Sequence, residues 1–298
     1  MISLRGRKVT GFDSCIEEIK RLIQTLQPKE KIQSSILSQE NLRRMAATVL
    51  FIPRASNPGA RLLDIGGTVY WVPIYVNLLG YKHISILERP GGAFCDDLRI
   101  PNHGNAFVVD VIKADSELDV YPIASQSVDC VACFHLLEHL AGDPMHLLAE
   151  SNRVLKQGGD FCLTTPNVLY FENMARFLLG GHPFSWPVYT DSYADRHNRE
   201  YTPNEVRKLL EAGGFHLNLL KTQSHTTVKD KRIRVLGYCL SLLGTLSGRV
   251  SPGLREAEIQ ARGTKVSGVV ERYPSFLYDL FGADRVTFKI RTRSLSEP

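Results

Sequence analysis

The chain has 298 residues, of which 43% are apolar and 22% charged, and 36 Lys and Arg against 31 Asp and Glu give a net charge of +5. This composition excludes intrinsic disorder, a collagen-like repeat and a small disulfide-rich scaffold. The basic residues are mostly scattered along the chain, which argues against a nucleic-acid partner.

The first residues and the cysteines bear on the cellular compartment. The chain opens MISLRGRKVT, which is basic but lacks the apolar stretch of a signal peptide, and no apolar run approaches the roughly 20 residues of a membrane span. Cys130 and Cys133 form a CxxC inside the apolar run VDCVACF, where residues three apart on a strand point to opposite faces. We therefore expect a cytoplasmic protein with free, buried thiols rather than a redox or metal-binding pair.

The first half of the chain predicts an α/β fold. Residues 1–58 are expected to form a helical cap, because two or three amphipathic helical patterns occur there without a strand. From about residue 61 to residue 163, short apolar runs alternate with helical patterns, and the runs are RLLDI, HISILE, AFVVD, VDCVACF and DFCLT. This alternation predicts a mostly parallel, Rossmann-like sheet covered by helices on both faces.

Two further helices follow. Asp143–Lys156 has apolar residues at helical spacing and runs into a Gly-Gly pair, a helix-stop signal. An irregular, aromatic-rich stretch over 168–200 separates it from a second helix, for which Thr202 is predicted as the N-cap, Pro203 as the first residue and Glu205 as the capping-box acid. The aromatic stretch is expected to be an insertion that faces a bound substrate.

The last core elements are predicted as two strands. FHLNLLKTQ follows the second helix, and RVTFKIRTR, within 284–298, is predicted as an antiparallel last strand with a tail. The core would then span 59–223, and the segment 224–283 between the two strands would be an insertion or lid, because it is too long for an ordinary connection.

The motif RLLDIGG is the first candidate for a ligand site. It places Asp64, Gly66 and Gly67 where a strand runs into a loop, and glycine there lets a nucleotide-like ligand approach the backbone amides. Glu88 ends the next strand, 24 residues after Asp64, which is near the spacing of a carboxylate that holds ribose hydroxyls. The alternative is structural: Asp64 caps a helix and Glu88 is a solvated loop acid.

Three segments together carry a resemblance to a known family: RLLDIGG, SVDCVACFHLLEHLAGDPMHLLAESNRVLKQGGDFCLTTPN with its LEH and RVLxxGG motifs, and HNREYTPNEVRKLLEAGGF. They resemble the class I S-adenosylmethionine-dependent methyltransferases, in the branch that acts on small molecules and glycans. The resemblance covers roughly 61–215 and implies the class I methyltransferase fold with S-adenosylmethionine as cofactor. The chain departs from the family's DxGxGxG loop, since Thr68 and Tyr70 stand where two glycines are usual.

The resemblance also implies a set of cofactor-binding residues. The methionine end would lie along Gly66, Gly67 and Thr68 beside Asp64, and Glu88, with Arg89 next to it, would hold the ribose. The remaining positions would meet the adenine (Asp110 and Val111) and border the methionine moiety (Phe134 and His135). For Asp110 an ordinary strand-to-loop turn is the alternative, and no metal ligand is assigned.

Two histidines are candidates for a catalytic base. His197 of DRHNREY precedes a helix start and is expected above the carboxyl edge of the sheet. His139 lies one residue after Glu138, and a His beside a carboxylate is a plausible general base. His135, Glu138 and His139 would converge in one helical turn, and some quinone-precursor O-methyltransferases bind a divalent ion through an acidic version of this cluster.

These features lead us to expect an O-methyltransferase acting on a hydroxyl of a sugar or glycan-linked small molecule. The alternatives are an O-methyltransferase for a quinone precursor or other planar metabolite, and a cofactor-binding protein without turnover. Residues 229–246 begin with basic residues and continue into the apolar run VLGYCLSLLGTL. We therefore expect a peripheral contact with the inner membrane surface, or packing against the sheet or a second subunit in a homodimer.

Overall fold

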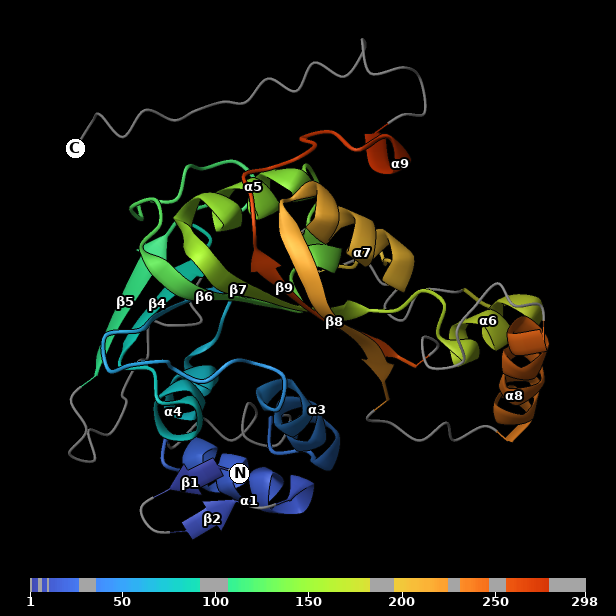
Figure 1. The fold of residues 1–298 in the computed structure, drawn as a ribbon. Coiled ribbons are helices and arrows are strands. Elements are labelled where there is room, and N and C mark those ends of the chain that lie inside the picture. Colours follow the sequence, from blue (N-terminus) through green and yellow to red (C-terminus); the bar gives the residue numbers. More distant parts are fainter. Residues whose placement is uncertain are drawn as a thin grey trace.

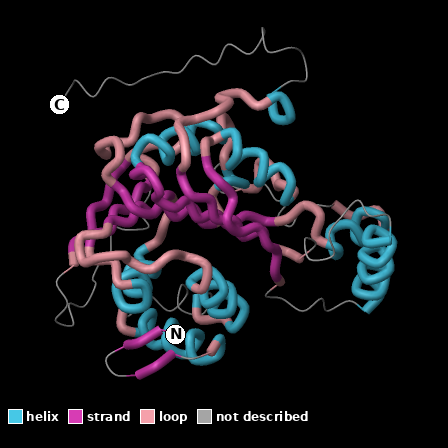
Figure 2. The backbone as a smooth tube through the Cα atoms, viewed as in Figure 1, coloured by secondary structure: helices cyan, strands magenta, loops and turns pink. Residues whose placement is uncertain are grey.

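A computed structural model describes residues 2–4, 7–9, 11–26, 36–91, 107–182, 196–224, 231–246 and 256–278. One central sheet lies between two layers of helices, with helices α6 (Phe171–Leu178) and α8 (Lys231–Leu246) to one side (Figure 1). Coloured by secondary structure, the strands of the central sheet form a band through the middle of the molecule, and two short strands near the N-terminus lie apart from it (Figure 2). The predicted α/β class is confirmed.

The central sheet has seven described strands in the order β5-β4-β3-β6-β7-β9-β8. Their bounds are β3 Arg61–Ile65, β4 His83–Glu88, β5 Val108–Lys113, β6 Val128–Phe134, β7 Leu155–Pro166, β8 Phe215–Gln223 and β9 Glu258–Lys265. Strands β3 to β7 are parallel, whereas β9 runs antiparallel to both neighbours, β7 and β8. The winding direction reverses between β3 and β6, which is where open α/β sheets bind ligands.

The antiparallel strand differs from the one that the sequence suggested. β9 lies within 224–283, where we expected an insertion, and 284–298 with RVTFKIRTR lies outside the described residues. The sequence of β9 is EIQARGTK, and its buried residues include the polar Glu258, Gln260 and Lys265. These polar side chains interrupt the apolar pattern, so no strand signal appears there.

The chain leaves and re-enters the sheet at neighbouring points on either side of α8. Gln223, the last residue of β8, is paired in register with Glu258, the first residue of β9. Just beyond this pair, the backbone amide of Ala257 donates to the hydroxyl oxygen of Ser224 at 3.2 Å. The two ends of the intervening segment are therefore held together.

The N-terminal helices cover one face of the sheet. The elements on this side are a small hairpin, two amphipathic helices and a short helical run after β3: β1 Ile2–Leu4, β2 Arg7–Val9, α1 Phe12–Gln24, α3 Gln39–Val49, η1 Val69–Trp71, α4 Val72–Ile74 and the π-helical turn η2 Tyr75–Leu79. Buried apolar side chains of α1 and α3 join those of the sheet in one core, and Cys130 and Cys162 contribute thiols to it. Cys130 and Cys133 are free and buried, as predicted.

Helices α5 (Pro144–Val154) and α7 (Pro203–Ala212) cover the opposite face, with the short α9 (Ser275–Tyr278) beside them (Figure 1). The predicted start of α7 is confirmed, because Thr202 accepts from the Glu205 amide at 3.1 Å and its own amide donates to the Glu205 carboxylate at 2.8 Å. Helix α5 ends earlier than predicted, since β7 begins at the next residue and contains the Gly-Gly pair.

Helices α6 and α8 pack against each other, and a Cβ added to Gly237 of α8 would lie 2.2 Å from the Phe171 ring of α6. Five large apolar side chains of this pair and of the residue after α6 remain exposed, and we call them the apolar patch: Phe177, Leu178, Leu179, Val235 and Leu242. No helix in the described ranges is long and apolar enough to span a bilayer.

Candidate functional site

The carboxyl ends of the parallel strands meet at one edge of the sheet, and the residues that follow them form the candidate site. Gly66 follows β3, Glu88 ends β4, His135 follows β6 and Asn167 follows β7. The ends of these four strands are thereby brought to a single edge, where ligands bind in folds of this kind (Figure 1).

The loop after β3 needs both of its glycines. Gly66 has φ +70°, a left-handed conformation that favours glycine, and its amide donates to the Leu87 carbonyl at 2.8 Å. A Cβ added to Gly67 would lie 2.1 Å from the carboxyl group of Asp64. Thr68 then caps the turn η1 in an extended conformation. The loop therefore places backbone without side chains close to the strand end, although Thr68 and Tyr70 replace two glycines of the DxGxGxG motif.

Asp64 lies beneath this loop and is only 1% exposed. Its Oδ2 atom accepts from the Tyr75 hydroxyl at 2.8 Å, and its buried Oδ1 atom has no hydrogen-bond partner among the described residues. Burial raises the pKa of Asp64 to about 7, and the bond from Tyr75 opposes the rise. An orphaned buried oxygen beside a glycine loop fits a site that is completed by a ligand's donor group.

The raised pKa of Asp64 predicts a pH-dependent stability. The folded protein keeps this proton between about pH 4 and 7, whereas the unfolded chain has lost it, so this contribution is full below pH 4 and is lost as the pH rises through 7. We expect the free energy of unfolding, from urea titrations at pH 5.5 and 8, to fall more in the wild type than in Asp64→Asn. Equal falls in both proteins would contradict the assignment.

Glu88 is 2% exposed at the end of β4. Its Oε2 atom accepts from the ammonium group of Lys113, the last residue of β5, at 2.8 Å. Lys113 is the register partner of Glu88. Glu88 is therefore a fixed carboxylate in the sheet edge and not a solvated loop acid, whereas Arg89 beside it is exposed.

Asp110 and Val111 lie within β5 rather than at its end. Asp110 is opposite Ser85 of β4, three residues before the final pair of the two strands, and both predicted adenine contacts are exposed. The carboxylate that follows the end of β5 is Asp115, whose amide donates to Asp119 at 2.8 Å. β5 therefore ends three residues later than the expected strand end at Asp110, because the strand continues through VIK.

Aromatic rings form an apolar wall beside the glycine loop. The Phe134 ring at the end of β6 lies 5.2 Å from the Trp71 ring and 6.1 Å from the Phe51 ring, measured between centroids. Trp71 also stacks on Tyr75, the residue that binds Asp64. Phe134 and Trp71 thus form one apolar surface beside the loop.

His135 is held between two buried carboxylates in a backbone with φ +50°. Its Nδ1 lies 3.2 Å from Glu138 Oε1 and its Nε2 lies 2.7 Å from Glu258 Oε2. Burial lowers the pKa of His135, but the two carboxylate bonds outweigh burial and raise it to about 9. His135 is therefore a cation that donates at both nitrogens at neutral pH, and it ties the β6 loop to β9.

A second cluster lies beside it, formed by Glu138, His139 and His197. Glu138 is fully buried, and its Oε2 atom accepts from the Thr165 hydroxyl at 2.9 Å. The rings of His139 and His197 meet edge to face at a centroid distance of 5.1 Å. Burial lowers the pKa of His139, so this imidazole is neutral at pH 7. The structure thus brings both predicted base candidates together, whereas His135 turns toward Glu258.

Two acids of this region carried no predicted role. Glu200 lies three residues after His197 and is 2.8 Å from its Nδ1 atom, so helical spacing within HNRE was a usable signal. Glu258 reaches His135 from a strand that was not predicted, 123 residues away, so no local pattern pointed to it.

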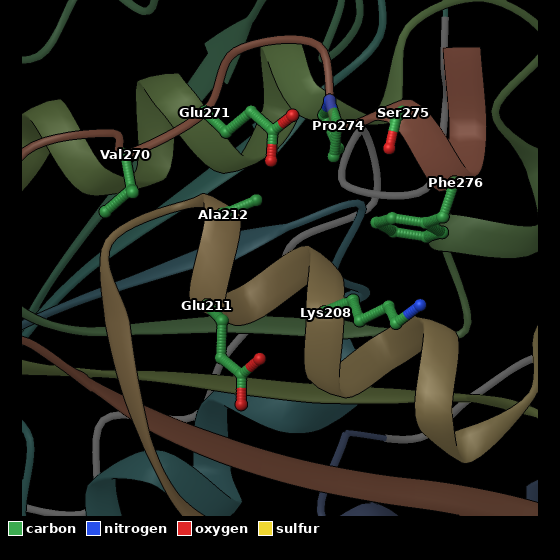
Figure 3. A pocket seen from close by; sticks show the side chains of 8 residues that line it. All are labelled: Lys208, Glu211, Ala212, Val270, Glu271, Pro274, Ser275 and Phe276. Carbon is green, nitrogen blue, oxygen red and sulfur yellow. The ribbon is translucent and has the colours of Figure 1, made fainter. Parts of the chain in front are cut away.

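A pocket of about 330 Å³ lies elsewhere, between α7 and the segment before α9 (Figure 3). Its lining includes Lys208, Glu211 and Phe276, with the Lys208 ammonium group 5.2 Å from the centre of the Phe276 ring. None of the predicted site residues lines it, so this pocket is separate from the strand-end site.

Comparisons with known proteins agree with this geometry. Residues 93–163 match the family model of a methyltransferase domain. A probable S-adenosylmethionine-dependent methyltransferase of Mycolicibacterium smegmatis is 34% identical over 96 residues, which are 32% of this chain and 32% of that protein. The chain therefore matches about a third of the length of this curated relative.

Solved structures share the fold at low sequence identity. The methyltransferase in a complex with the Trm112 methyltransferase activator of Haloferax volcanii superposes with a TM-score of 0.52 and 15% identity, over 84% of this chain and 98% of that chain. An S-adenosylmethionine dependent methyltransferase of Mesorhizobium loti gives 0.49 and 16%, over 76% and 98%. The sheet order and the Haloferax structure show that this chain has the class I methyltransferase fold, and its residues 93–163 match a methyltransferase domain.

Proposed function

We propose that this protein is an S-adenosylmethionine-dependent O-methyltransferase whose acceptor is a hydroxyl of a sugar or glycan-linked small molecule. The observation that carries the proposal is the convergence at one sheet edge of a glycine loop, the strand-end carboxylate Glu88 and the paired imidazoles of His139 and His197. The resemblance of the LEH and HNREYT segments to the small-molecule and glycan branch supports the acceptor class.

The residues at the strand ends fit the cofactor. Gly66 and Gly67 supply backbone amides that no side chain covers, and the buried Oδ1 atom of Asp64 beneath them has no hydrogen-bond donor among the described residues. Glu88 would hold the ribose hydroxyls, and Asp115 would meet the adenine amine. When bound, the cofactor supplies a methyl group on a positively charged sulfur, and Phe134 and Trp71 would shield that region from water.

His139 and His197 would act as bases toward the acceptor hydroxyl. His139 donates from Nδ1 to the Arg196 carbonyl at 3.0 Å, and His197 Nδ1 lies 2.8 Å from Glu200. The Nε2 atom of each ring is thereby turned away from these partners, and it would take up the proton of the substrate hydroxyl. An alkyl hydroxyl is a weak nucleophile that gains from such a base, which favours a sugar over an acidic phenol.

The proposal is tested first at the cofactor. Glu88→Ala should weaken S-adenosylmethionine binding by about 1.5–3 kcal/mol, the scale for a lost charged hydrogen bond. Calorimetry measures the affinity, and Glu211→Ala on the outer side of α7 is the control that should bind as the wild type does. Unchanged affinity in folded Glu88→Ala would remove the ribose role.

Turnover is tested with a panel of acceptors. Formation of S-adenosylhomocysteine with glycosides, but not with catechols or hydroquinones, is the expected outcome. Turnover with planar phenols alone would assign the quinone-precursor alternative. Cofactor binding without turnover on any acceptor would leave a binding protein and contradict the enzyme proposal.

The second part of the proposal concerns the apolar patch, for which we propose an anionic membrane surface as the partner. Lys231 and Arg232 are exposed at the start of α8, on the same helix as Val235 and Leu242 of the patch. Exposed apolar side chains next to basic residues suit a helix that lies at an anionic bilayer, where a lipid-linked acceptor would be found.

Sedimentation with vesicles tests this contact. Anionic vesicles should pellet the wild-type protein at low salt, and Leu242→Glu should lower the pelleted fraction several-fold, because a charge replaces an inserted apolar group. Val270→Glu, which changes an exposed valine outside the patch, is the matched control. Wild-type protein that stays in the supernatant at low and physiological salt would overturn the proposal, and a dimer broken by Leu242→Glu would assign the patch to self-association.

A further inference from the structure

The cluster of Glu138, His139 and His197 has the composition of a metal site. One ligand atom from each residue lies within 4.8 Å of the other two, so all three can face one point. Glu138 is fully buried, and the side chain of His197 is 12% exposed. The three side chains come from two segments that the backbone joins directly, since the amide of Asn198 donates to the Glu138 carbonyl at 2.7 Å.

The two imidazoles are oriented as metal ligands usually are. Each Nδ1 is bonded to an outer partner, the Arg196 carbonyl for His139 and the buried Glu200 carboxylate for His197. Within the ranges that the structure describes, no hydrogen bond is made by either Nε2 atom. Such outer partners fix the ring, select the tautomer with a free Nε2 and raise the basicity of the ligand.

The charges around the cluster also favour a cation. Three buried carboxylates, those of Glu138, Glu200 and Glu258, lie in and around it. Nearby guanidinium groups are turned to other partners, since Arg199 bonds Glu205 at 2.6 Å.

We propose that Glu138, His139 and His197 bind one divalent transition-metal ion, with Zn²⁺, Fe²⁺ or Mn²⁺ as the class of ion. Two imidazoles and one carboxylate form a donor set for such ions, and they leave coordination positions open for water or substrate. Ligand atoms at about 2.1 Å from one ion lie roughly 3–4 Å apart, so closing the site needs a shift of about 1 Å. His135 is excluded as a ligand, because both of its nitrogens are bonded to carboxylates.

The catalytic consequence rests on the proposed function. An ion here would lie beside the acceptor hydroxyl and act as a Lewis acid that lowers the pKa of that hydroxyl, and the two imidazoles would then serve as ligands instead of bases. Binding of the ion itself does not depend on methyl transfer, so the two proposals can fail separately.

The test is metal binding by the full-length protein after removal of metal with a chelator. Calorimetry with ZnCl₂ and the visible absorption of added Co²⁺ should show one ion per chain. His197→Ala should weaken binding at least 100-fold, and Glu200→Gln, which keeps all three ligands, should weaken it about 10-fold, the scale for an outer partner. His216→Ala, which removes an exposed histidine of β8, should bind like the wild type.

Circular dichroism and thermal unfolding report whether each variant is folded. If His197→Ala does not fold, the metal affinities of His139→Gln and Glu200→Gln are compared with that of the wild type instead. No ion bound at micromolar concentrations, or wild-type affinity in folded His197→Ala and His139→Gln, would overturn the site. Methyl transfer that persists in protein freed of metal would refute the Lewis-acid role of the ion, and ion binding without methyl transfer would refute the proposed function alone.

Discussion

Gly67→Ala is expected to lower the free energy of unfolding by about 3 kcal/mol and to abolish cofactor binding at micromolar concentrations, because the fully packed loop cannot take a methyl group. The new Cβ would lie 2.1 Å from the Asp64 carboxyl carbon, inside a site that is closed by Tyr75. The loop must move away from the strand end to relieve the contact, and the backbone cradle moves with it. Urea titration and calorimetry measure the two effects.

Two further variants isolate the cause. Gly268→Ala adds the same methyl group where nothing lies within 4 Å, and it should leave both quantities within experimental error of the wild type. Asp64→Ala combined with Gly67→Ala removes the obstructing carboxyl, so the double variant should regain part of the stability that Gly67→Ala loses. A Gly67→Ala protein with wild-type stability would show that the loop is looser than the structure has it.

His197→Ala is expected to lower kcat about 100-fold while the affinity for S-adenosylmethionine stays within twofold of the wild type. The ring packs edge to face on His139 in the cluster that we propose acts on the acceptor hydroxyl, and positioned acid–base groups contribute roughly 10²–10⁴ to the rate. Steady-state kinetics with the best acceptor of the panel gives kcat, and calorimetry gives the cofactor affinity.

The split between kcat and affinity is the diagnostic feature of this variant. A loss of cofactor affinity equal to the loss of kcat would place His197 in the cofactor site or in the packing of the loop. His216→Ala provides the baseline for removing an exposed histidine. Normal kcat and KM in His197→Ala would show that neither a base nor a metal ligand acts at this position.

The sequence was sufficient for the features that depend on neighbouring residues. The glycines of RLLDIGG, the carboxylate at the end of HISILE and the capping box around Thr202 are each fixed by a few consecutive residues, and the structure has them at the predicted places. The parallel sheet was predictable for the same reason, since each of its inner strands is a short, nearly continuous apolar run.

Features that depend on distant partners were not predictable. β9 is buried in the sheet, yet it carries Glu258 and Gln260, and the Glu258 carboxylate accepts from His135 and from the side-chain amide of Gln260. β9 can bury a charged residue because a distant histidine binds it, and such a strand lacks the apolar periodicity from which strands are predicted. The end of β5 was misplaced for a different reason, because an acid inside an exposed edge strand looks like an acid at its end.

The hydrogen bond from the Ala257 amide to the Ser224 hydroxyl holds the two ends of the segment around α8 together, so this segment is replaceable. Its two ends leave the sheet at paired residues, Gln223 and Glu258, so β8 and β9 form an antiparallel pair whose register does not depend on what lies between them. Loop-closure entropy changes slowly with length, so a short turn or an inserted reporter domain can replace 225–255 at little energetic cost to the sheet. The fold therefore offers a point where one peripheral element can be exchanged for another while the pairing of β8 and β9 is kept, in evolution and in engineered variants alike.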